Sequence, residues 1–207
     1  MLRIGHRGAK GYVAENTFKS IKKAIQLNVD GIEIDVFKCL SGQLVLSHDA
    51  DLERMTGKSG AIENLTLEEL DDYLINKEYK ICTLNEILEK IKDPLLINIE
   101  LKGSDTATTT SEIINDFLVK GTWNIEDFIV SSFDWFKLEK FRFFEKNIPV
   151  GILVSKSMSI NEAIKFAKKI DAQAIHPNYE LLNEKTIRKI KNNGFKLYTW
   201  TVNDKDK

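Results

Sequence analysis

The chain has 207 residues, of which 43% are hydrophobic and 29% charged, and its formal net charge at pH 7 is −1. This length suits a single domain with a substantial core, and the composition excludes an intrinsically disordered chain. The 30 basic and 31 acidic residues balance each other, so the chain has no general field for nucleic acid or a membrane surface.

Apolar segments typical of strands and of amphipathic helices alternate along most of the chain. The predicted strands are residues 2–6, 31–36, 94–101, 127–133, 149–155, 172–177 and 195–202. The predicted helices are residues 15–28, 83–92, 107–119, 134–146, 159–170 and 183–193. Such alternation indicates a parallel sheet with right-handed crossovers.

No glycine-rich dinucleotide motif follows the first predicted strand, so the pattern favours a closed barrel over an open doubly wound sheet. We therefore predict an α/β protein with a TIM (β/α)8-type barrel. Only seven barrel strands are visible, and the last helix and strand of an eight-stranded barrel are missing from this chain. We expect either a truncated chain or a natural protein with about 25 more residues, one βα unit.

The alternation is interrupted after residue 36. The dipeptide Ser41-Gly42 predicts a hairpin with a two-residue loop, which would place Asp35 opposite His48 on the returning strand. Residues 51–80 form a polar excursion with one short helical segment. We interpret it as a small insertion over the barrel mouth, within a single domain of residues 1–207.

The start of the chain also bears on location. Met1 is followed at once by the first predicted strand, which leaves no room for a signal peptide, and no apolar run approaches the ~18 residues of a membrane span. Cys39 and Cys82 lie far apart and form no zinc-binding pattern, and we predict no disulfide between them. We expect a cytoplasmic protein with no stable membrane anchor.

Acidic residues share one face of two predicted strands. Glu33 and Asp35 alternate with aliphatic residues in "GIEIDV", and Glu100 and Lys102 repeat this alternation in "INIELKG". If helices cover both faces of the sheet, these carboxylates are enclosed and need a cation or a ligand. Three carboxylates without a cysteine suit Mg²⁺ or Ca²⁺ better than zinc.

Histidines and further cations fall at the same strand ends. His6 and His48 are suited to general acid and base catalysis, and Arg7 and Lys102 to holding phosphate oxygens. Taken singly, each residue has an ordinary alternative, such as a surface hydrogen bond. Four separate segments that place compatible groups at one rim favour a site.

Two residues near the end of the chain have competing interpretations. Trp200 fits either barrel packing or the wall of a substrate site. His176, in "AIHPN", is expected to cap the end of a strand rather than to take part in chemistry.

Ordered motifs give a more specific indication. They are "HRG" at 6–8, "ENT" at 15–17, "EIDV" at 33–36, "HD" at 48–49, "ELK" at 100–102 and "YTWTVN" at 198–203. Together they resemble the glycerophosphodiester phosphodiesterase family. The resemblance implies a TIM barrel that hydrolyses a small-molecule glycerophosphodiester to glycerol 3-phosphate and an alcohol with one divalent cation, Mg²⁺ or Ca²⁺.

The same resemblance implies a role for each matching residue. The implied catalytic pair is His6 and His48, the metal ligands are Glu33, Asp35 and Glu100, the substrate-binding residues are Arg7, Lys102 and Trp200, and the supporting residues are Glu15 and Asn16. It leaves open which histidine takes the proton, and whether water or the glycerol hydroxyl attacks phosphorus.

Other functions remain as alternatives. One alternative is a phospholipase D-like enzyme with the same barrel, which would act on a lysophospholipid or sphingomyelin. Another is a non-catalytic barrel that binds phosphodiesters without turnover. Paired carboxylates also occur in glycoside hydrolases, but the crowded cations favour a phosphate over a sugar. The head group, the metal and the oligomeric state stay open.

Overall fold

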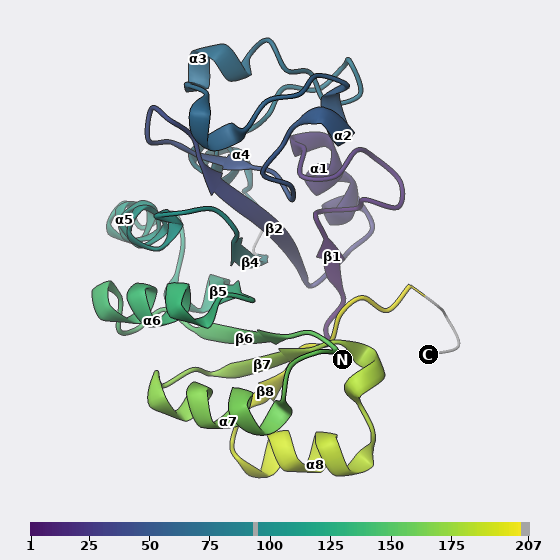
Figure 1. Ribbon diagram of the computed structural model, residues 1–207, viewed down its shortest axis with the longest axis vertical. Helices are drawn as coiled ribbons and strands as arrows, with labels where there is room; N and C mark the ends of the chain where they lie inside the picture. The colour runs from purple at the N-terminus through teal and green to yellow at the C-terminus, as the bar shows by residue number, and fades with distance from the viewer. Residues whose placement is uncertain (93–94, 204–207) are drawn as a thin grey trace. The chain divides into compact units, whose positions relative to one another are not determined.

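The structure is a computed structural model that describes residues 1–92 and 95–203. It divides into two compact units, residues 1–128 and residues 129–207, and each is described by itself (Figure 1). The first residue of the predicted strand 94–101 lies outside the described residues, and the observed strand begins at Leu96.

Three parallel strands in the order β1-β2-β4 form the centre of the first unit. They are β1 (Ile4–His6), β2 (Gly31–Lys38) and β4 (Leu96–Leu101). The helices of this part are α1 (Phe18–Gln26), α4 (Leu84–Lys90) and α5 (Thr106–Val119), with a short 3₁₀ helix, η2 (Ile125–Asp127). The strands and helices predicted for this unit are therefore observed, with ends shifted by at most three residues.

The central strand of the first unit is enclosed on both faces. Every residue of β2 from Gly31 to Phe37 is buried. Ile32 and Ile34 are fully buried, and they pair with Ile97 and Ile99 of β4. The strand thus belongs to a sheet of the covered parallel kind, and its acidic face does not meet open solvent.

The hairpin after β2 has a different register from the predicted one. β3 (Leu44–Leu46) pairs antiparallel to β2 so that Val36 lies opposite Leu46, which brings Ser47 rather than His48 opposite Asp35. The prediction that Asp35 faces His48 is wrong by one residue. The cause is the loop, which has three residues because Cys39 N–H donates to the Gln43 carbonyl, with Gly42 at φ 98°.

The polar excursion after the hairpin has a small core of its own. Its elements are α2 (Glu53–Thr56), η1 (Ile62–Asn64) and α3 (Leu67–Leu70), which begins with a capping box between Thr66 and Glu69. The buried cluster joins the excursion to the β2–β3 hairpin and consists of Phe37, Cys39, Val45, Leu52, Ile62, Leu70, Ile75 and Ile81. The excursion is therefore packed on the end of β2 and is not a free loop.

The second unit has four parallel strands in the order β5-β6-β7-β8. They are β5 (Phe128–Ser132), β6 (Val150–Val154), β7 (Ala174–Pro177) and β8 (Lys196–Leu197). The helices are α6 (Trp135–Phe144), α7 (Ile160–Lys169) and α8 (Glu184–Asn192), with the 3₁₀ helix η3 (Tyr179–Leu181). In Figure 1, α7 and α8 lie along one face of β6 to β8. β8 is shorter than the predicted strand 195–202.

Side-chain caps fix where most of these helices begin. Thr17, Thr83, Asp134, Ser159 and Asn183 each accept a hydrogen bond from a backbone N–H of the first turn. The longest helix among the described residues is α5, with 14 residues. None of the described helices combines the length and the apolar character needed to cross a bilayer.

Candidate active site

The parallel register of the first unit gathers its charged side chains on one face. His6 pairs with Glu33 across β1 and β2, and Asp35 pairs with Glu100 across β2 and β4. Paired residues in neighbouring strands point to the same side of the sheet. The alternation read from the sequence therefore places these four groups together, on the face opposite Ile34.

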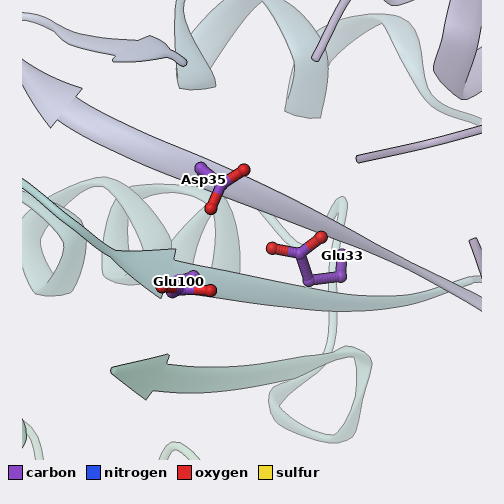
Figure 2. Close-up of side chains that lie close together, drawn as sticks. All are labelled: Glu33, Asp35 and Glu100. Atoms are coloured by element: carbon purple, nitrogen blue, oxygen red, sulfur yellow. The ribbon is translucent and has the colours of Figure 1, made fainter. Parts of the chain in front are cut away.

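Three of these residues form a compact acidic cluster. Each of Glu33, Asp35 and Glu100 offers a carboxylate oxygen, and these oxygens lie within 4.8 Å of one another. Figure 2 shows the three carboxylates converging from two neighbouring strands. The residues are 8%, 1% and 8% exposed, respectively, so the cluster is enclosed.

Burial makes this cluster electrostatically unfavourable without a cation. Burial and the charges of Asp35 and Glu100 raise the pKa of Glu33 well above its ordinary value. Burial and the charge of Asp35 raise the pKa of Glu100 to about 7. Burial also raises the pKa of Asp35, against the opposing effects of Asn16, Lys102 and Arg7. Three ionised carboxylates at this distance need compensation by positive charge.

The donor set fits a hard divalent cation. Glu33 Oε1 and Asp35 Oδ1 are buried and accept no hydrogen bond, which is unusual for buried carboxylate oxygens. Carboxylate oxygens are the ligands preferred by Mg²⁺ and Ca²⁺. The cluster can therefore hold such an ion, and it satisfies the predicted juxtaposition of Glu33, Asp35 and Glu100.

Two cationic side chains border the cluster. Lys102 Nζ lies 3.1 Å from Glu100 Oε1 and 3.8 Å from Asp35 Oδ1. Arg7 Nε lies 3.4 Å from Asp35 Oδ2, and its Nη1 donates to Glu15 Oε1 at 2.8 Å. Both predicted cations are thus at the site, where they partly compensate the carboxylates.

The loop after β1 holds the cluster through unusual backbone conformations. Arg7 has φ 51° and Asn16 has φ 55°, a region that asparagine tolerates better than most residues. In these conformations the Arg7 backbone N–H donates to Glu33 Oε2 at 2.9 Å, and Asn16 Nδ2 donates to Asp35 Oδ2 at 2.9 Å. The predicted supporting residues Glu15 and Asn16 therefore contact Arg7 and Asp35, respectively.

His6 lies directly beside the acidic cluster. Its Nε2 is 3.8 Å from Glu33 Oε2. Burial, with smaller effects from the charges of Lys10 and Arg7, lowers the pKa of His6 to about 3. The imidazole is therefore neutral at pH 7.

His48 belongs to the same unit and has a carboxylate partner. Its Nδ1 lies 2.6 Å from Asp49 Oδ1, and Asp49 in turn accepts a hydrogen bond from Arg54 Nε. A carboxylate on Nδ1 favours the tautomer with the proton on that nitrogen, which leaves Nε2 for chemistry. Neither Asp49 nor Arg54 was assigned a role from the sequence, although both lie in or near matched motifs. Their contact depends on the fold of the excursion, which no periodicity reveals.

Two residues considered from the sequence lie in the second unit. Trp200 Nε1 donates to the His176 carbonyl at 2.8 Å, and the Trp200 ring packs edge-on against Phe133. The His176 side chain does not cap a strand end as expected. It is buried within β7, and its Nε2 has no hydrogen-bond partner. Burial lowers the pKa of His176 to about 3.

Comparison with known proteins places this site in a family. The model of the glycerophosphoryl diester phosphodiesterase family matches residues 6–207. The chain belongs to this family. It is 32% identical over 216 residues to a glycerophosphodiester phosphodiesterase of Caldanaerobacter subterraneus subsp. tengcongensis, a match that covers 99% of this chain and 87% of that one.

Solved structures of the family agree with this assignment. A glycerophosphodiester phosphodiesterase from Thermotoga maritima has 30% identity and a TM-score of 0.79, covering 100% of this chain and 88% of that one. An Oleispira antarctica phosphodiesterase, solved with sn-glycerol-3-phosphate, has 28% identity and a TM-score of 0.87, covering 98% and 85%. The predicted fold class is confirmed, and family membership makes the chain a phosphoric diester hydrolase.

Proposed function

We propose that this chain hydrolyses glycerophosphodiesters to glycerol 3-phosphate and an alcohol with one divalent cation, Mg²⁺ or Ca²⁺. The observation that supports this most is the enclosed cluster of Glu33, Asp35 and Glu100, with two carboxylate oxygens that accept no hydrogen bond. These three residues would hold the cation. When bound, such an ion neutralises phosphate charge and stabilises the charge that develops during hydrolysis.

The phosphate group would be bound by the cations at the edge of the cluster. Arg7 and Lys102 already lie between 2.8 and 3.8 Å from carboxylates of the site. Arg7 Nε is buried and makes no hydrogen bond. A phosphate oxygen would give this donor a partner, and a guanidinium suits phosphate geometry well.

His6 and His48 would transfer protons to and from the reacting oxygens. One histidine takes the proton of the attacking oxygen, and the other gives a proton to the leaving alcohol oxygen. The bond from phosphorus to the attacking oxygen forms as the bond to the alcohol oxygen breaks. The attacking oxygen belongs to water or to the glycerol part of the substrate, and the second route passes through a cyclic phosphate that water opens.

The comparisons support the substrate class and the extent of the catalytic domain. The relative from Oleispira antarctica was solved with sn-glycerol-3-phosphate, which is the product proposed for this chain. The family model covers residues 6–207, which supports residues 1–207 acting as one catalytic domain. We also propose a cytoplasmic location, with which the two buried free thiols of Cys39 and Cys82 agree.

The test is an assay of glycerol 3-phosphate release after EDTA treatment. Glycerophosphocholine, glycerophosphoethanolamine and glycerophosphoinositol are each supplied with Mg²⁺ or Ca²⁺. We expect turnover of at least one substrate that depends on the added ion. Binding without turnover under every ion would support the non-catalytic alternative and contradict the proposal.

A lysophospholipid added to the same assay tests the phospholipase D alternative. Faster turnover of this lipid than of all three glycerophosphodiesters would overturn the substrate class while leaving the metal site in place. Because the two substrate classes share the phosphodiester, the comparison isolates the preference for an acyl chain.

A further inference from the structure

Five side chains form a continuous network of hydrogen bonds and ion pairs in the first unit. Arg7 Nη1 donates to Glu15 Oε1 at 2.8 Å, and Arg54 Nη2 donates to the same oxygen at 2.6 Å. Arg54 Nε donates to Asp49 Oδ2, and Asp49 Oδ1 lies 2.6 Å from His48 Nδ1. Arg54 thus connects the residue proposed to bind phosphate with one of the two histidines proposed to transfer protons.

Arg54 is supplied by the polar excursion. It lies in α2, the short helix that follows Leu52, and Leu52 belongs to the buried cluster that joins the excursion to the β2–β3 hairpin. Leu52 and Met55 also line a cavity of about 10 Å³ together with Glu15 and His48. This space is about the size of one water. The excursion therefore packs closely against Glu15 and His48.

Each of the three guanidinium nitrogens of Arg54 has a partner within the first unit. Its Nε is used by Asp49, its Nη2 by Glu15, and its Nη1 by the Met55 sulfur at 3.0 Å. A planar fork can serve two carboxylates at once, which a lysine ammonium on a flexible stem does poorly. The contacts of Arg54 are those of a residue that orients others.

Both carboxylates in the network are kept ionised. Burial raises the pKa of Glu15, but the hydrogen bond from Arg54 and the charge of Arg7 outweigh it, so the pKa is lowered. Asp49 behaves in the same way, with Arg54 and His48 outweighing burial. Each carboxylate is therefore an acceptor at neutral pH.

We propose that Arg54 is a positioning residue that orients His48 through Asp49 and Arg7 through Glu15. The role of the excursion at residues 51–80 is then to supply one guanidinium that sets the geometry of two parts of the site. This inference rests on the function proposed above for His48 and Arg7. Its first test does not depend on turnover.

The first test is a spectrum of the histidine ring nitrogens, recorded by NMR on protein with ¹⁵N-labelled histidine. In the native chain we expect His48 to carry its proton on Nδ1. In Arg54→Met we expect that preference to be weakened, with a shift toward the Nε2 tautomer or an average of both. An unchanged His48 spectrum in a folded Arg54→Met variant would overturn the proposal.

A second variant keeps the proposal testable if Arg54→Met does not fold. Asp49→Asn keeps the size of the side chain but removes the charge that favours the Nδ1 proton. We expect the same change in the His48 spectrum as in Arg54→Met. If Asp49→Asn left the His48 tautomer unchanged, the connection from Arg54 to His48 would not exist.

Kinetics form the second test. Arg54→Met should lower kcat by about 10- to 100-fold, a range typical for groups that orient active-site residues, with a smaller change in KM. Arg54→Lys should restore only part of kcat. Arg54 is half-exposed, with 49% of its side chain accessible, so added guanidinium ion should partly rescue Arg54→Ala. A kcat equal to that of the native chain in Arg54→Met would contradict the proposal.

The matched control is Arg188→Met, which removes an exposed arginine paired with Glu184 on α8. We expect this variant to match the native chain in both tests. If the native chain itself turned over no glycerophosphodiester, the proposed function would fail, whereas the tautomer test would still decide the role of Arg54.

Discussion

The two units bury polar groups in different ways. In the first unit, neighbouring strands enclose Glu33, Asp35 and Glu100 within reach of one ion. Among the described residues of the second unit, the buried side-chain atoms without hydrogen-bond partners are neutral at pH 7, namely Ser131 Oγ and His176 Nε2. Enclosed charge costs far more free energy than a neutral polar atom, so a cluster of three carboxylates with two oxygens that accept no hydrogen bond makes the first unit the candidate site.

One arginine in each unit shows the same difference in its hydrogen-bond acceptors. Arg142 in the second unit is buried and donates only to oxygens of carbonyl type, from Ile170, Glu145, Lys146, Asp171 and Gln173. Arg54 in the first unit contacts two carboxylates that continue to His48 and Arg7. The first arrangement ties together backbone segments, whereas the second orients reactive side chains.

The largest expected effect comes from removing one ligand of the acidic cluster. Asp35→Asn should lower kcat/KM by about ten-thousandfold, since a bound cation supplies several kcal/mol of transition-state stabilisation. The thermal midpoint in EDTA should not fall, because the substitution removes one of three mutually repelling carboxylates. Steady-state kinetics and thermal unfolding measure the two effects. Activity within tenfold of the native chain would show that Asp35 is not a ligand.

The histidines provide the next contrast between the units. His6→Ala and His48→Ala should each lower kcat by about a thousandfold, within the range for a general acid or base. His176→Gln should change kcat by less than about twofold, because His176 is buried within β7 and takes no part in the proposed proton transfers. Glycerol 3-phosphate release measures all three. An equal loss of kcat in all three variants would contradict the prediction that the two histidines of the first unit take part in the reaction and that His176 does not.

Arg142→Met tests whether the buried arginine of the second unit contributes to stability and not to turnover. It removes one donor from each of five acceptor oxygens, two of which keep a second donor, and leaves their segments unconnected, so we expect the free energy of unfolding to fall by about 3 kcal/mol. Denaturant unfolding measures the change, and kcat per folded molecule should stay the same. A fall in kcat without loss of stability would give Arg142 a role in the reaction.

The smallest predicted effect is a dependence of metal affinity on pH. Without metal, Glu100 has a pKa of about 7, above its ordinary value, so it binds a proton below pH 7 that a cation must displace. Affinity should therefore fall as the pH falls through 7, by about tenfold per pH unit or more, because Glu33, whose pKa is also raised, must lose its proton as well. Calorimetric titration with Ca²⁺ between pH 5.5 and 8.5 measures this. An affinity that rises on acidification would contradict the assignment.

Alternation of residues predicted most of the strands and the acidic cluster, because a parallel register brings residues such as Asp35 and Glu100 side by side. The hairpin register was missed because loop length depends on a single glycine, Gly42, whose φ of 98° the sequence does not show. The contacts of Arg54 were missed because they arise from packing of an irregular segment. Regular elements could thus be predicted from local patterns, whereas contacts between loops could not.

The central claim is that the acidic cluster of the first unit holds a divalent cation. The most direct measurement is anomalous diffraction from crystals soaked in Mn²⁺, which replaces Mg²⁺ or Ca²⁺ on oxygen ligands. We expect a strong peak within bonding distance of Glu33, Asp35 and Glu100, and none at this position in crystals of Asp35→Asn. A native crystal without a peak at these carboxylates, or with its ion bound elsewhere, would contradict it.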